Sequence, residues 1–159
     1  MIKINDRQAI NIVRDVLRDN LEDPLEQWGH AERTWIHTDY PLAVATLPRI
    51  QIMKRGPSTS EIIDIGPDFL EWKTLVLDIW FWTKLGFKWD NGDTYLKDEE
   101  FVKEYLDKIW KTIKAKCEWL KLTYKITGLA NLEEGTPEKE TDSQRYRGVI
   151  SIRIWYFPK

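Results

Sequence analysis

Asp64, Glu71 and Lys73 come closest in the sequence to a catalytic pattern. An Asp on one strand and a Glu-x-Lys on the next can hold Mg²⁺ and polarise a water, as in metal-dependent nucleases. Two features weaken this interpretation. Asp64 lies close to the turn residues Gly66-Pro67, and Glu71 falls at the beginning of a predicted strand. Because 31% of the residues are charged, such a spacing arises easily by chance, and a structural role is favoured.

Other candidates for chemistry are weaker. His30 and His37 are the two histidines, and no Cys or carboxylate completes a metal-ligand spacing around them. The segment 90–93 (Asp-Asn-Gly-Asp) lacks the later acidic positions of a calcium loop, and Asn-Gly is typical of a tight turn. Phosphate loops, nucleophile elbows and zinc-protease helices are absent from the sequence. We therefore predict no catalytic residue, no metal ligand and no cofactor, and a protein that is not an enzyme.

The charge balance and the aromatic content of the chain indicate which kind of partner it binds. The 24 basic and 26 acidic residues give a formal net charge of -2, without the basic excess typical of nucleic-acid binding. No apolar run is long enough to span a bilayer, and the N-terminus lacks the order of a signal peptide, so we expect no membrane contact and synthesis in the cytoplasm. Nine Trp exceed what a small core absorbs, and large rings are enriched at interfaces. Contact with another protein is the expected use.

Hydrophobic periodicity predicts a single α+β domain over residues 1–159. Its mixed or antiparallel sheet and two main helices follow the order α-β-β-β-α-β-β. The first helix covers about residues 6–21, with Asn5 as N-cap and Gln8 three positions later. The second has Asp98 as its N-cap and continues to about Leu120, which places Cys117 in the core. The predicted strands are residues 49–54, 61–65, 73–83, 121–126 and 148–157, with a further short strand near 34–38.

A polar segment interrupts the pattern near the C-terminus. Residues 133–144 contain no apolar anchor, so residues 133–147 are predicted to form a mobile loop or a binding loop. The charged residues expected to contact a partner are Glu133, Glu134, Glu138, Lys139, Glu140 and Arg145. The same segment also contains Asp142 and Arg147.

The central strand is apolar on both faces. Its aliphatic residues alternate with Asp78, Trp80 and Trp82, and the last strand places Trp155 on the corresponding face. These aromatic side chains form either a second buried layer or a subunit interface, since so short a chain has few elements left to cover a second face. Asp78 is expected to pair with Arg153 or with a group on a partner subunit.

Three segments carry a resemblance to a known family: 40–52 (Tyr-Pro-Leu leading to Leu-Pro-Arg-Ile-Gln-Ile), 75–82 (Leu-Val-Leu-Asp-Ile-Trp-Phe-Trp) and 146–156 (Tyr-Arg-Gly-Val-Ile-Ser-Ile-Arg-Ile-Trp-Tyr). Together with the order of elements, they resemble the first, central and C-terminal strands of the tail terminator, or tail completion, proteins of tailed phages and archaeal tailed viruses. The resemblance covers most of the chain, although none of these strings is diagnostic. The long segment 22–47 is not expected from it.

The resemblance implies a non-enzymatic virion assembly protein. Such a protein is made in the host cytoplasm and forms a ring, a hexamer in this family, at the head-proximal end of the tail. Its partners would be other copies of itself, the tail tube protein and the head-tail connector protein, with DNA passing through the lumen without specific binding. The charged residues of the 133–147 loop would face the tube or lumen, and Asp78, Trp80, Trp82, Arg153 and Trp155 would form the subunit interface. The alternatives are the Asp64, Glu71 and Lys73 nuclease and a small adaptor that binds one protein.

Overall fold

A capping box begins the first helix. The Asn5 side chain accepts a hydrogen bond from the Gln8 amide at 2.8 Å, and the Gln8 side chain accepts one from the Asn5 amide at 3.0 Å.

The computed structural model describes residues 2–38, 46–64, 70–140 and 144–159. The elements follow in the order α1 (Asp6–Asn20), η1 (Pro24–Trp28), β1 (Ile36–His37), β2 (Arg49–Lys54), β3 (Thr59–Asp64), β4 (Leu70–Lys84), β5 (Trp89–Asp90), β6 (Tyr95–Leu96), α2 (Asp98–Ala115), α3 (Cys117–Tyr124), β7 (Thr127–Glu134), β8 (Glu138–Lys139) and β9 (Arg145–Tyr156).

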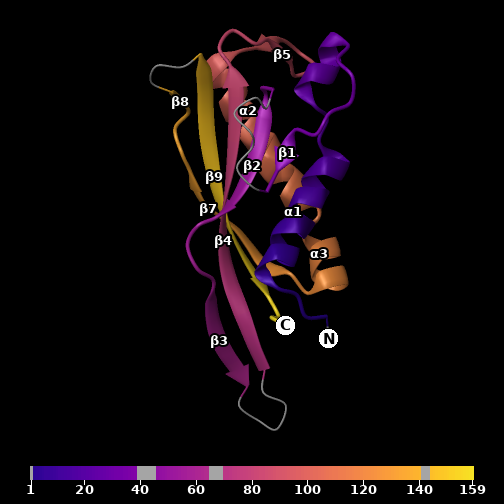
Figure 1. The fold of residues 1–159 in the computed structure, drawn as a ribbon, viewed down its shortest axis with the longest axis vertical. Helices are drawn as coiled ribbons and strands as arrows, with labels where there is room; N and C mark the ends of the chain where they lie inside the picture. Colours follow the sequence, from indigo (N-terminus) through magenta and orange to yellow (C-terminus); the bar gives the residue numbers. More distant parts are fainter. Residues whose placement is uncertain (1, 39–45, 65–69, 141–143) are drawn as a thin grey trace.

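One mixed sheet organises the chain. Its main path runs β1-β2-β4-β9-β7, with β3 paired to the beginning of β4 and β8 to the beginning of β9. β1 runs parallel to β2, and the other pairs of this described sheet are antiparallel. β5 and β6 form a separate hairpin. The structure is a single α+β domain, as predicted, and the β3–β4 hairpin extends below the helices in Figure 1.

The helices cover one face of the sheet. α1, α2 and α3 lie on the same side of the strands (Figure 1), and aliphatic side chains of β2, β4 and β9 share one buried core with residues of these helices. The central members of this core are Ile50, Ile52, Leu75, Leu77, Ile79, Phe81, Val102, Leu106, Ile109, Ile150, Ile152 and Ile154, all buried. Gly148 lets β9 approach α2, because a Cβ there would lie 2.7 Å from side-chain atoms of both Val102 and Leu106. The apolar face of each amphipathic element therefore packs into a single core.

The region after α2 differs from its prediction. Residues 121–124 of the strand expected at 121–126 are the end of helix α3. The N-cap of α2 is Lys97 rather than Asp98, and α2 stops at Ala115 rather than continuing to Leu120. Alternation over so few residues fits a helix as well as a strand, and here the buried Leu120 lies four positions from Tyr124 while Leu122 is 66% exposed. Lys125 then adopts a left-handed conformation and ends the helix. Because a new helix starts at Cys117, this residue leaves the apolar stripe and is exposed rather than buried.

The predicted mobile loop at residues 133–147 is partly sheet. Glu133 and Glu134 end β7, Glu138 and Lys139 form β8, and Arg145 begins β9. β8 forms because its backbone pairs with β9, and the sequence of residues 133–147 contains no pattern that predicts this pairing. Residues 141–143 lie outside the described part of the chain. No helix that the structure describes is both long and apolar enough to cross a membrane.

Candidate interaction face

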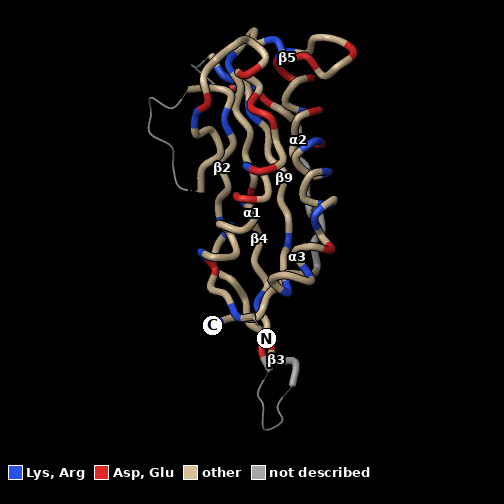
Figure 2. Tube along the Cα trace, turned by 90° about the vertical axis from the view of Figure 1, so that its right-hand side faces the viewer, with Lys and Arg blue, Asp and Glu red and all other residues tan. Residues whose placement is uncertain are grey.

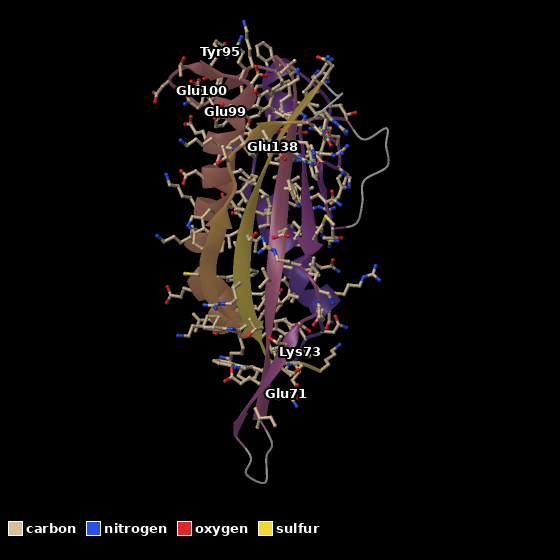
Figure 3. All side chains as sticks on the ribbon, turned by 90° about the vertical axis from the view of Figure 1, so that its left-hand side faces the viewer. Glu71, Lys73, Tyr95, Glu99, Glu100 and Glu138 are labelled. Atoms are coloured by element: carbon tan, nitrogen blue, oxygen red, sulfur yellow. The ribbon has the colours of Figure 1, made fainter. Side chains whose placement is uncertain are left out.

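The second face of the sheet has no described helix over it. Cross-strand register places Arg49 opposite Trp82, Trp82 opposite Arg147, and Arg147 opposite Glu138, so one row of side chains crosses four strands. Residues directly opposite in antiparallel strands share a face and are close enough to interact. Figure 3 views this face, with Glu138 over the sheet. The row brings together residues that are far apart in the sequence.

Arginine side chains lie over the tryptophan rings. The guanidinium carbon of Arg49 is 5.1 Å from the Trp82 ring centroid, and that of Arg147 is 5.4 Å from the Trp80 ring centroid. The two rings are stacked, with their centroids 5.6 Å apart. Each guanidinium is thus within the range at which a cation is attracted to an indole face. The burial of Arg49, followed by the charge of Arg145, lowers the pKa of the Arg49 guanidinium, and Glu140 opposes this change.

Two glutamates of the β8 segment neutralise part of this charge. Glu138 lies 2.9 Å from Arg147, and Glu140 lies 2.7 Å from Arg145 and 3.6 Å from Arg147. Of the predicted loop residues, Glu138, Glu140 and Arg145 therefore join the edge of the same face. The side chains of Glu133 and Glu134 lie outside the described part of the structure. Lys139 is exposed, and its backbone pairs with Tyr146.

Asp78 has a different partner from the predicted one. It contacts Arg55, with Nη2 of Arg55 at 2.9 Å from Oδ1, and the Ser151 hydroxyl donates to the same oxygen at 2.6 Å. Arg153 lies opposite Val76, one row further along β4, and its guanidinium carbon is 5.0 Å from the Trp155 ring centroid. The expected Asp78–Arg153 pair is therefore wrong, because the partner of Asp78 within the chain is Arg55, which directly follows β2.

The lower part of the face continues the aromatic surface. Trp155 stacks on Trp72 with ring centroids 5.3 Å apart, and the Trp72 indole nitrogen donates to Glu61 at 3.3 Å. Nε of Arg153 is buried and makes no hydrogen bond within the described structure. The predicted interface residues Asp78, Trp80, Trp82, Arg153 and Trp155 consequently share one sheet face.

A cavity of about 370 Å³ lies at the upper end of this face, and we call it the Arg–Trp cavity. Its described lining is Arg49, Gln51, Met53, Trp80, Trp82, Glu140, Arg145 and Arg147. Three arginines against one glutamate make this described lining basic. Sequence reasoning assigned the two tryptophans to this face and Arg145 to a polar loop, but it did not connect Arg49 or Arg147 with the tryptophans. A signal for Arg49 was present, since Arg49, Gln51 and Met53 occupy every second position of one predicted strand and therefore share a face. Arg145 and Arg147 are also two positions apart, but they precede the predicted strand at residues 148–157.

The candidate nuclease residues lie at the opposite end of the sheet (Figure 3). Glu71 is opposite Ile62 in the β3–β4 hairpin, and the Asp64 side chain is outside the described part of the structure. Lys73 Nζ is 4.0 Å from Asp6 of α1.

The two candidate histidines, His30 and His37, do not form a metal site with carboxylates. Within the described residues, no group of three or more His, Cys, Asp or Glu is placed to hold a metal ion. Burial, with the charges of Arg18, Arg49 and Arg33, lowers the pKa of His37.

Asp6 is the centre of a polar cluster at the start of α1. It accepts hydrogen bonds from Tyr156, from Ser58 at 3.0 Å and from Lys54 at 3.2 Å, while Lys73 adds a nearby charge. Burial raises the pKa of Asp6, but these four groups outweigh it and hold the pKa below its ordinary value. The cluster joins the start of the first helix to one end of the sheet, where Lys73 of β4 pairs with Tyr156 of β9, and it gives Lys73 a structural contact.

Comparisons with known proteins do not assign the chain to a family. The chain matches no protein-family model and has no significant similarity to a curated protein.

Proposed function

We propose that this protein is a non-enzymatic virion assembly protein that forms a ring, like a tail terminator. The observation that carries the proposal is the aromatic and arginine-rich sheet face, which lies opposite the helix-covered core. Tryptophan and arginine are enriched among residues that dominate binding energy at protein interfaces. A second copy of the chain is the occupant that this proposal assigns to that face.

The remaining parts of the proposal come from the family resemblance. The ring, a hexamer, would cap the tail tube, contact the head-tail connector and let DNA pass without specific binding. The first helix, the strands at β2, β3, β4 and β9 and the helix α2 follow the predicted order, which supports the resemblance in architecture, although η1, β5, β6, α3, β7 and β8 differ from it. The β3–β4 hairpin extends past the helical layer and is suited to reach a neighbouring protein of the tail (Figure 1).

The nuclease alternative has less support. Its lysine contacts Asp6, which is itself bonded to Tyr156 and Ser58, so Lys73 has a structural contact away from any proposed metal. The adaptor alternative differs from the ring only in its partner. It predicts a chain that stays monomeric until a different protein is added.

Light scattering across a concentration series tests the proposal. We expect an oligomer much larger than the 19.0 kDa chain, which Trp80→Asp disperses. Trp119→Asp is the matched control, because Trp119 is 46% exposed on α3, in the helical layer. Circular dichroism checks that both variants keep the fold. A wild-type chain that is monomeric at every concentration would contradict ring formation by the chain alone.

A plasmid-nicking assay in Mg²⁺ and Mn²⁺ tests the alternative in parallel. We expect no nicking above the level of a mock purification. Nicking that disappears with Glu71→Ala would replace the assembly proposal with the nuclease.

A further inference from the structure

A second surface carries the charge and the aromatic residues that complement the Arg–Trp cavity. Trp28 and Tyr95 are 50% and 60% exposed, and their rings stack with centroids 6.1 Å apart. Glu99 and Glu100 follow in the first turn of α2, and both are exposed. We call these four residues the acidic end. It pairs two exposed aromatic rings with two carboxylates on one short stretch of surface.

The carboxylates of the acidic end make no polar contact with the part of the chain that the structure describes. Neither Glu99 nor Glu100 makes an ion pair or a side-chain hydrogen bond with any described residue. Their neighbour Glu104 differs, because it accepts a bond from Asn91 at 3.0 Å. Figure 2 shows red Asp and Glu positions near β5, with some blue Lys or Arg beside them, and further blue positions along α2 toward α3. The acidic end thus presents available charge of the sign opposite to that of the cavity.

The two surfaces lie at the same level of the molecule but on different sides. β5 and β8 both lie at the upper end in Figure 1. In Figure 3, Glu138 is over the sheet, whereas Tyr95, Glu99 and Glu100 are at the edge beside α2. A rotation axis parallel to the long axis of the molecule would preserve this level, so one surface of a copy can meet the other surface of its neighbour. Such head-to-tail contacts generate rings when the rotation closes.

We propose that the acidic end of one copy docks onto the Arg–Trp cavity of the next, so that the ring is held by one repeated head-to-tail contact. This inference rests on the proposed self-assembly and specifies its interface. Glu99 and Glu100 lie against Arg145 and Arg147 of the neighbour, in competition with the intrachain carboxylates Glu138 and Glu140. The aromatic pair covers the rim of the cavity. Complementary charge of this kind fixes the register of an interface and excludes other pairings.

Two charge-reversal variants of the full chain separate the surfaces. Glu99→Arg/Glu100→Arg removes the acidic end and leaves the cavity, while Arg145→Glu/Arg147→Glu does the reverse. We expect light scattering to find each variant as a monomer. An equimolar mixture is expected to assemble again, into species of at least 38 kDa, twice the 19.0 kDa chain, because the native pair of surfaces remains and the two reversed surfaces also carry opposite charges. A face-to-face contact between two Arg–Trp cavities predicts instead that Glu99→Arg/Glu100→Arg assembles as the wild type does, because its cavity is intact.

Two control variants test whether the change of charge itself, or a loss of helix stability, explains the loss of assembly. Asp19→Arg/Glu118→Arg makes the same change of charge at exposed helical sites, and we expect it to assemble as the wild type does. Glu99→Gln/Glu100→Gln avoids placing cations at a helix N-terminus, and we expect it to weaken assembly at least tenfold in the midpoint concentration. Circular dichroism and thermal melting establish that every variant folds.

The outcomes are distinct. The inference is overturned if Glu99→Arg/Glu100→Arg assembles normally, or if the two folded variants stay monomeric when mixed although the wild type assembles. In both cases dispersal by Trp80→Asp would leave the proposed function standing. A wild-type chain that never assembles would overturn both. Wild-type binding of a labelled single-stranded oligonucleotide that is lost in Arg145→Glu/Arg147→Glu would assign the cavity to nucleic acid instead.

Discussion

Arg33→Ala is expected to lower the free energy of unfolding by about 3–5 kcal/mol. Nε and Nη2 of Arg33 donate to the two oxygens of Asp23 at 2.8 and 2.9 Å, and the Asp23 side chain is 3% exposed. Arg33 also donates to the Thr46 carbonyl at 2.8 Å and to the Pro48 carbonyl. Removal of the cation leaves a buried carboxylate without its paired charge, which is the costly half of breaking a buried ion pair.

The effect of Arg33→Ala should extend to the interaction face. Its bonds to residues 46 and 48 fix the segment that enters β2, whose first residue is Arg49 of the Arg–Trp cavity. Urea unfolding followed by circular dichroism gives the stability, and light scattering gives the assembly midpoint. Adding Asp23→Ala should recover part of the loss, but not all of it, since Asp23 also accepts a bond from the Leu25 amide at 3.1 Å. A loss below about 1 kcal/mol, the range of exposed pairs, would refute the reasoning.

Three further predictions concern packing, pH and exposure. Gly148→Ala should cost about 1–3 kcal/mol in urea unfolding, with part recovered by Val102→Ala, because the new methyl group would lie 2.7 Å from the Val102 side chain. Since the pKa of folded Asp6 is below its ordinary value of 3.8, its contribution to stability is present above that pH and is lost as the pH falls through the lower folded value. Asp6→Asn should therefore flatten the acid limb of a stability profile measured by urea unfolding. Cys117 should react with a thiol reagent in the native protein, at one equivalent per chain and without denaturant.

The long elements could be predicted because local pattern and tertiary packing agree. β4 was expected over residues 73–83 and spans Leu70–Lys84, and α1 begins at its predicted capping box. The prediction for residues 117–124 was wrong for the opposite reason, since eight residues of mixed pattern fit both the helical and the strand period, and the choice depends on packing after the helix break at Lys116. Short segments carry too little periodicity to decide their own structure.

The interaction face could be predicted only in part. Alternation assigns Trp80 and Trp82 to one side of a strand from local sequence alone. Their arginine neighbours depend on register between strands, which joins Trp82 to Arg49 and Arg147 across 33 and 65 residues of chain. The Arg55–Asp78 contact is equally non-local, at a separation of 23 residues. Position on a face is a local property, whereas the partner across it is set by the whole sheet.

If the chain assembles as proposed, the same sheet face is exposed in the free subunit and covered in the ring, and the arginine side chains over the indole rings suit it to both states. A layer of bare aliphatic residues would have to be covered at once, and an exposed patch of that kind promotes aggregation. Here the guanidinium groups of Arg49 and Arg147 lie against the faces of Trp82 and Trp80, so the rings are partly covered before any partner arrives. The same cations supply the charge that a carboxylate-bearing neighbour would recognise. The mixture of tryptophan and arginine therefore fits a reversible contact better than a second hydrophobic core.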